Sequence, residues 1–279
     1  MTTTAHRANG ETTGTADRGT RGIDVTRTGR IFGWLFIGTF VTSIPARLLF
    51  VHGVGASWSN MQFVPGDTST ASLKFGAVLE FGLIVTQLAT AIVIYPLVRR
   101  QSESVALGYV GARTMESVFA AIGLISIISV VSIADSLAGA RGAEATALTT
   151  QGNSLVQSYD WAFMWGPGLV AGVGNGVLLG YLMYRSGLVP RRMALLGLIG
   201  GPLLILSFML KLGGVYDAGS TADGLLTLPE AAWELSLGVY CAWKGFKTTS
   251  PIADSEAVLT LPEPRTTGRV SDEAQTADR

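Results

Sequence analysis

The sequence predicts an all-α protein that crosses a lipid bilayer as a bundle of six transmembrane helices, with both termini in the cytoplasm. Two observations support this fold class. The 279-residue chain is 48% hydrophobic and only 14% charged, whereas soluble domains average about 25% charged residues. The apolar residues gather in six long stretches, and the basic residues cluster at alternate ends of these stretches.

Each apolar stretch is close to the ~20 residues that a helix needs to cross the hydrocarbon core. We therefore expect one transmembrane domain over residues 29–247. The connections at 52–72 and 135–158 are rich in small polar residues and too short for separate domains, so we expect them to form caps or short interfacial helices. The predicted spans are residues 31–51, 73–98, 115–134, 159–184, 193–212 and 229–246.

The basic residues set the predicted orientation. Cytoplasmic connections of membrane proteins carry an excess of Lys and Arg, so the side that carries them here is predicted to be the cytoplasmic side of the cell inner membrane. The opposite connections carry mainly acidic residues. The basic residues on the predicted cytoplasmic side are Arg27, Arg30, Arg99, Arg100, Arg113, Arg185, Arg191, Arg192, Lys244 and Lys247.

The two ends of the chain differ from the apolar centre in composition. Residues 1–28 nearly lack large apolar side chains, and residues 248–279 combine prolines with scattered charges. Such segments bury too little surface to offset the entropy of ordering. We expect both to be disordered cytoplasmic tails.

Several classes of function lack support in the sequence. A formal net charge of zero gives no electrostatic basis for nucleic-acid binding. With Cys241 as the single cysteine, and His6 and His52 far apart, we expect neither a metal site nor a cofactor. The sequence contains no phosphate-binding loop and no hydrolase or metalloprotease motif. We assign no catalytic residues, and the balance favours a protein that is not an enzyme.

Ionisable residues inside the predicted spans form the candidate polar cluster. Charged groups in a membrane are costly and usually face the bundle interior, a partner or water. We expect the members to converge on a cavity that faces outward. They are Arg47, Glu80, Asp160, Lys211 and Glu234.

Structural explanations exist for many of these polar residues. Glu230 follows Pro229 and can complement a helix N-terminus, and Lys211 can reach the outer interface with its long side chain. Arg113 and Glu116 are spaced as a local ion pair at the inner surface. For Arg47 and Glu80, an interhelical ion pair and a ligand or proton site are equally good interpretations.

Two rows of small residues predict helix packing. Ser126, Ser129 and Ser132 follow one face of the third predicted helix, where we expect hydrogen bonds to a neighbouring helix. A glycine stripe in the fourth predicted helix should allow another helix to cross closely, because small residues let backbones approach. The stripe consists of Gly168, Gly172, Gly176 and Gly180.

The segment Tyr181–Arg191, which reads YLMYRSGLVPR, resembles the LxYRSGxxPR turn of the DUF4386 family of bacterial membrane proteins. Shorter segments also fit, and the resemblance covers about residues 27–247. It implies a six-helix inner-membrane protein but no activity and no catalytic residues. The shorter segments are Arg30–Gly33, Tyr95–Leu97, Arg113–Glu116 and Trp243–Phe246.

The turn also has a physical explanation that requires no family. Gly187 can adopt positive φ and end a helix, and Pro190 suits the start of the next one. Three arginines around the turn are candidates for contacts with anionic head groups or phosphate, at about 1 kcal/mol of surface attraction each. They are Arg185, Arg191 and Arg192.

Three functions remain open at this level. The first is a non-enzymatic integral membrane protein of unknown molecular function. The second is a small-solute or ion-coupled transporter that uses Arg47, Glu80 and Glu234, and the third is a membrane enzyme that acts on lipids. In each case the lipid bilayer is the main partner, and the transmembrane helices offer surfaces for homo- or hetero-oligomers.

Overall fold

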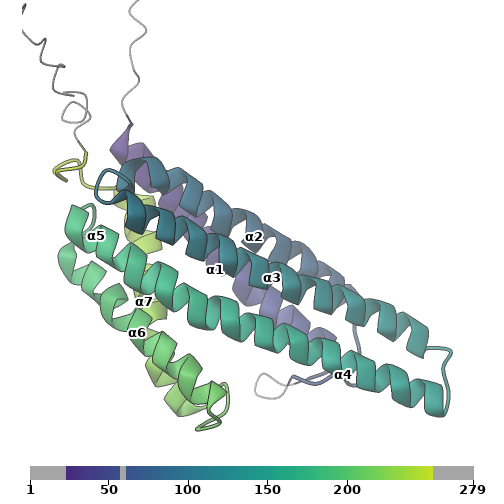
Figure 1. The fold of residues 1–279 in the computed structure, drawn as a ribbon. Coiled ribbons are helices and arrows are strands. Elements are labelled where there is room, and N and C mark those ends of the chain that lie inside the picture. The colour runs from purple at the N-terminus through teal and green to yellow at the C-terminus, as the bar shows by residue number, and fades with distance from the viewer. Residues whose placement is uncertain (1–22, 57–60, 254–279) are drawn as a thin grey trace, which may run out of the picture.

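The computed structural model describes residues 23–56 and 61–253, and all regular elements in these residues are helices (Figure 1). The helices are α1 (Val25–Gly53), α2 (Thr70–Val98), α3 (Glu103–Leu137), α4 (Ala143–Phe163), η1 (Met164–Val170), η2 (Gly172–Leu179), α5 (Gly180–Ser186), α6 (Arg191–Leu212) and α7 (Thr221–Lys244). Four of these, from α4 to α5, follow one another directly and form one continuous helical rod, Ala143–Ser186. We call it the fourth rod.

Five of the six rods are long and apolar enough to span a membrane: α1, α2, α3, the fourth rod and α6. The all-helical prediction is therefore confirmed for the described residues. Helix α7 has 24 residues, but Glu230 and Glu234 interrupt its apolar sequence, and it falls outside this group.

Helix boundaries differ from the predicted spans because local capping extends the helices beyond the apolar core. Helix α3 begins at Glu103 rather than near residue 115, since the Ser102 side chain accepts a hydrogen bond from the Val105 amide and caps the helix. The fourth rod begins at Ala143. The segment 143–158, expected to be part of a connection, is thus helical.

The six rods form a closed ring. Each rod packs against its neighbours in sequence, and α1 packs against α7 to complete the circle. Both described chain ends lie at one end of the bundle, where Figure 1 also places α5. We call this the basic end, because the arginines and lysines that flank α1, α2, α5, α6 and α7 lie there. We call the other end the opposite end. Towards it, α6 and α7 diverge from α3 and α4 (Figure 1).

Glycines permit the closest crossings in the ring. A Cβ on Gly176 would overlap the Cα of Gly201, so the fourth rod and α6 touch through their backbones. Gly172 and Gly180 also face α6, whereas a Cβ on Gly168 would meet its nearest neighbour, Phe208, only at 3.9 Å. The α1–α7 crossing is equally tight, because a Cβ on Gly33 would overlap the backbone of Ala242.

Part of each predicted tail belongs to the folded bundle. Helix α1 begins at Val25, ahead of the predicted boundary at residue 28, because Asp24 caps it. At the other terminus, residues 245–253 fold back over the basic end, and we call them the C-terminal strap. The Ser250 hydroxyl donates to the Ser186 carbonyl at 2.7 Å, and Ile252 is buried. The predicted tail residues 1–22 and 254–279 lie outside the described residues.

Candidate functional site

A cavity of about 550 Å³ occupies the centre of the ring, and residues of all six rods line it. Its wall is unusually rich in charge for the interior of an apolar bundle. Six acidic and three basic side chains line it. They are Glu80, Glu116, Asp160, Asp223, Glu230 and Glu234, with Arg47, Arg113 and Lys211.

Each of the three basic side chains is engaged by a carboxylate. Arg47 Nη1 on α1 lies 2.8 Å from Asp160 Oδ1 on α4. Arg113 and Glu116, both on α3, are 2.7 Å apart. Lys211 on α6 lies 2.9 Å from Asp223 on α7. No further ion pair is found among residues 23–56 and 61–253.

The Arg113–Glu116 pair forms the deepest part of the wall, near the middle of α3. Arg113 is 2% exposed, and Glu116 accepts a second hydrogen bond, from Gln87 Nε2 on α2, at 2.9 Å. Arg113 also donates to Thr90 Oγ1 on α2. These bonds join the pair to two side chains of α2, so it ties α2 to α3 inside the bundle, although Arg113 Nε makes no hydrogen bond among the described residues.

This burial corrects the expectation that Arg113 lies in a basic connection and pairs with Glu116 at the inner surface. Since α3 begins at Glu103, Arg113 lies ten residues inside the helix, about 15 Å from its start. The side chain faces the cavity rather than the lipid head groups.

The fourth rod faces α7 through an unusual backbone segment. Residues Met164–Val170 and Gly172–Leu179 are π-helical, a form that is rare and often found at functional sites. Pro167 and the repeated glycines weaken the α-helical alternative here. The Asn175 carbonyl accepts a 2.9 Å bond from Trp233 Nε1, and the Asn175 amide donates to Glu234 Oε1 at 2.6 Å.

Three cavity carboxyl groups have no salt-bridge partner among the described residues: Glu80, Glu230 and Glu234. Glu80 lies about 15 Å from the start of α2 and is 6% exposed. Glu230 and Glu234 lie on successive turns of α7. The cavity therefore presents more acidic groups than its own cations can neutralise.

Aromatic rings shape the part of the cavity around Arg47. The Arg47 guanidinium lies 5.0 Å from the centre of the Tyr159 ring and 4.8 Å from that of Phe163. Phe40 and Met164 add apolar surface to the same wall. The faces of aromatic rings attract cations, so this wall suits a positively charged group.

The Lys211–Asp223 pair closes the side of the cavity between α6 and α7. Asp223 also accepts hydrogen bonds from Ser207 Oγ at 2.8 Å and from the Gly219 amide at 2.9 Å. Burial tends to raise the pKa of the Asp223 carboxyl, but the bonds from Gly219, Lys211 and Ser207 outweigh burial and lower that pKa below its usual value. Asp223 lies at the start of α7, before the predicted span.

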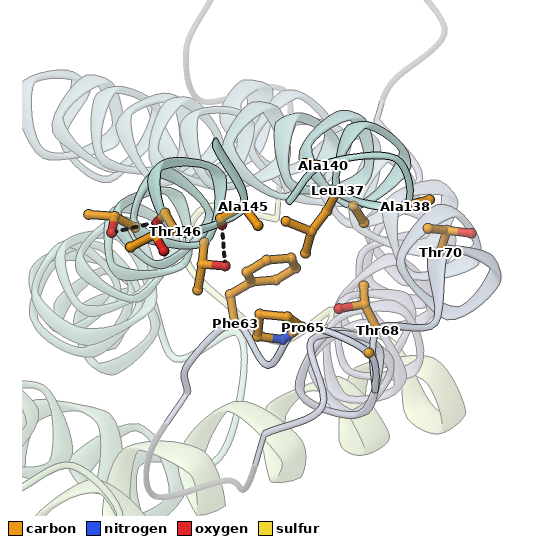
Figure 2. Close-up of a pocket in the computed structure, with 13 residues that line it drawn as sticks. Phe63, Pro65, Thr68, Thr70, Leu137, Ala138, Ala140, Ala145 and Thr146 are labelled. Atoms are coloured by element: carbon orange, nitrogen blue, oxygen red, sulfur yellow. Dashed lines mark hydrogen bonds between the residues drawn. The ribbon is translucent and has the colours of Figure 1, made fainter. Parts of the chain in front are cut away.

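A second, larger cavity of about 720 Å³ lies at the opposite end, between the ends of α3 and α4 and the connection that leads into α2. Figure 2 shows Phe63 and Pro65 projecting into it from that connection. Its lining consists of apolar, alanine and threonine residues and no ionisable group. We therefore regard the central cavity as the candidate site, on chemistry rather than size.

The structure places all five members of the candidate polar cluster on the central cavity: Arg47, Glu80, Asp160, Lys211 and Glu234. Their function stays a prediction. Lys211 pairs with Asp223, and Glu230 lies in the cavity wall within α7. Sequence reasoning did not single out Gln87 or Asn175, because buried amides do not stand out in an apolar stretch as charges do.

Other predicted residues lie away from this cavity. Arg185, Arg191 and Arg192 are exposed at the basic end, around a turn where Gly187 ends α5 with a φ of 67°. The serine row was expected to bond to a neighbouring helix. Instead, Ser126 and Ser129 donate to carbonyls four residues earlier in α3, since a short hydroxyl side chain reaches its own backbone first.

The side chains that line the cavity suit the binding of positively charged groups. Across the described ranges, no three His, Cys, Asp or Glu side chains gather as a metal ion requires. Cys241 is a buried free thiol in the apolar core. The carboxyl groups and aromatic walls can hold a cation, a proton or both.

Fold and site together define an all-helical protein with helices that can span a membrane and a charged cavity at its centre. The family described as "Domain of unknown function (DUF4386)" matches residues 31–245, and the chain belongs to this family. The resemblance seen in the sequence is thus confirmed, and family membership brings no named activity. The searches of curated proteins and of solved structures found no match.

Proposed function

We propose that the protein is a membrane transporter that binds a small organic cation in the central cavity. The observation that carries the proposal is the surplus of carboxyl groups: three cations are paired, and Glu80, Glu230 and Glu234 remain. A positively charged solute would compensate this surplus where water cannot. A cavity of about 550 Å³ lies within the ~300–1,000 Å³ typical of small-molecule sites.

The shape of the bundle supports access from one side. Cavity-lining residues run from Lys211, Gly219 and Asp223 near the opposite end to Arg113 and Glu234 at mid-depth. Beyond that depth, an apolar core that includes Phe32, Leu237 and Cys241 fills the ring at the basic end. An alternating-access transporter needs such a difference between an accessible half and a closed half.

The proposed orientation places the basic end in the cytoplasm, with α7 as the sixth span and both termini inside a bacterial inner membrane. The support is the set of basic residues at that end. Because Cys241 is buried, the wild-type protein should react little with thiol reagents. In intact cells, an impermeant maleimide should label the exposed variant Glu144→Cys and not the exposed variant Arg185→Cys. The reverse pattern would contradict this orientation.

Flux measurements in proteoliposomes test the transport proposal. Radiolabelled choline and tetraethylammonium serve as probes, and the wild-type protein should take up at least one of them with saturation. Glu80→Gln removes the charge and keeps the shape, so uptake at low probe concentration should fall about tenfold, the equivalent of 1.4 kcal/mol.

The matched control is Glu144→Gln, because Glu144 is an exposed acid at the start of α4, outside the cavity. Its uptake should equal that of the wild type. Saturable uptake that is the same in the Glu80→Gln variant and the wild type would remove Glu80 from the site. Absence of uptake for every organic cation tried, with folded protein in the vesicles, would count against the transporter itself.

A further inference from the structure

Glu230 occupies an exceptional place in the ring. Its Oε2 atom lies 2.8 Å from the position that a Cβ would take on Gly176 of η2, and 2.8 Å from that position on Gly200 of α6. The carboxyl group thus sits where the fourth rod, α6 and α7 meet. Only glycines at both neighbouring positions leave room for it.

The carboxyl group of Glu230 makes no hydrogen bond within the described part of the chain. Both oxygens are buried and without a partner, and the residue is 2% exposed. An ionised carboxylate accepts several hydrogen bonds, and leaving one unsatisfied in a low-dielectric interior costs several kcal/mol. The surroundings therefore disfavour the charged form.

The charged neighbours point the same way. The groups that act on Glu230 electrostatically are Glu234, one turn along α7, and Glu116 on α3. Both are acids, and Arg113, the basic side chain of α3 that lines the cavity, is already bound to Glu116. No basic side chain of α6 or η2 pairs with Glu230 among the described residues.

The confined space limits what can neutralise this carboxyl. Gly176 and Gly200 crowd Oε2 from the fourth rod and from α6, which leaves little room around this atom for the shell of oxygen ligands that a metal ion requires. No cluster of metal-ligating side chains exists in the described ranges. A proton needs no such shell and makes the group neutral by forming an O–H bond.

We propose that Glu230 is a proton-binding site that is linked to occupation of the central cavity. When a cationic solute arrives, its charge stabilises the ionised form, so the proton leaves Glu230 for water in the cavity. By linkage, protonation must weaken solute binding by the same factor by which the solute weakens proton binding. The linkage rests on the proposed transport function, whereas the proton site itself does not.

The proton site is tested first without any solute. Infrared spectra of the purified protein near neutral pH should contain the carbonyl stretch of a protonated carboxylic acid, which shifts in heavy water. Glu230→Gln should remove this band, and the exposed-acid control Glu144→Gln should keep it. A wild-type spectrum without the band, or a band that survives in Glu230→Gln, would overturn the assignment.

Glu230→Met is a second test variant in case Glu230→Gln does not fold, because methionine keeps the side-chain volume without a carboxyl group. Sodium chloride is compared with potassium chloride in the same samples. Equal spectra in the two salts support a proton site. A band that sodium alone removes would show that the site takes Na⁺ and would overturn the proposal.

The linkage is tested by adding tetraethylammonium or choline to the detergent-solubilised protein in weak buffer with a pH indicator. The wild type should release about one proton for each cation bound, and Glu230→Gln should bind the cation with no release. Binding without release in the wild type would overturn the linkage. Absence of binding alone would refute the transport proposal, while the infrared result still decides the proton site.

Discussion

The halves of the bundle at the basic end and at the opposite end are built from the same rods but are filled differently. At the basic end, Phe32, Tyr109, Leu237 and other buried apolar side chains pack into one core cluster. Towards the opposite end, apolar packing persists among α1 to α4, around Phe50 and Tyr159. There a charged cavity separates these helices from α6 and α7.

This difference separates stability from function along the axis of one molecule. The filled half buries apolar surface, which is the main source of stability. The hollow half gives up such burial and keeps buried carboxyl groups, which is costly. Substitutions in the filled half should therefore mainly change unfolding. Substitutions of the unpaired cavity acids should mainly change binding.

The largest effect is expected where the two halves meet, at the Arg113–Glu116 pair. Arg113→Leu leaves Glu116 buried without its counter-charge and should lower the free energy of unfolding by about 3–5 kcal/mol. Adding Glu116→Leu removes the stranded charge and should restore most of that loss. Denaturant unfolding in mild detergent measures both. Equal free energies of unfolding for the single and double variants would show that the unpaired charge of Glu116 is not the cause of the destabilisation.

A smaller loss is expected in the filled half from Gly33→Ala. The added Cβ would overlap the backbone of Ala242, and the helices must separate, at about 1–3 kcal/mol. Gly111→Ala is the matched control, because a Cβ at Gly111 on α3 meets nothing within 4 Å. Thermal unfolding should show a lowered midpoint for the first variant only. Similar midpoints would mean that the α1–α7 crossing is looser than described.

In the hollow half, Glu80→Gln should change the free energy of unfolding by less than about 1 kcal/mol, since Glu80 loses no salt bridge. The same variant is expected to impair uptake in vesicles, so function and stability respond separately. A large destabilisation would show that Glu80 has a structural role, and it would contradict the expectation that unpaired cavity acids mainly affect binding.

The smallest effect concerns Asp223. Because its pKa is lowered in the folded protein, its stabilising contribution is present above the ordinary carboxyl pKa and is lost as pH falls through the folded value. The wild type should therefore lose stability on acidification somewhat more steeply than Asp223→Asn. Midpoints recorded across the acidic range test this, and parallel curves would mean that Asp223 does not contribute.

The sequence predicted the helical class and the convergence of five charged residues for one physical reason. An ionisable group in an apolar stretch is costly to expose to lipid, so Arg47 and Glu234 were expected to face the bundle interior. The same reasoning failed for Arg113, because a basic residue near a predicted span edge was assigned to the connection. The overlooked signal was Ser102, which caps α3 so that the helix begins at Glu103 and includes Arg113.

Other features had no readable signal. Asn175 appeared only within a glycine-rich run, and its two contacts with α7 depend on the π-helical backbone of η2. Gln87 contacts Glu116 only because α2 and α3 pack in one register. Uncharged amides and helix register are properties of the assembled bundle, which hydropathy and charge patterns do not encode.

The C-terminal strap has a practical consequence for handling the protein. Its Lys247 amide bonds the Leu188 carbonyl, and the Ile252 carbonyl accepts from Arg100. Shortening the gene to end at Phe246 would expose Leu188 and Ser186 and free the α5–α6 corner. A purification tag or fluorescent reporter should therefore be joined after Ala253, so that the C-terminal strap keeps its contacts.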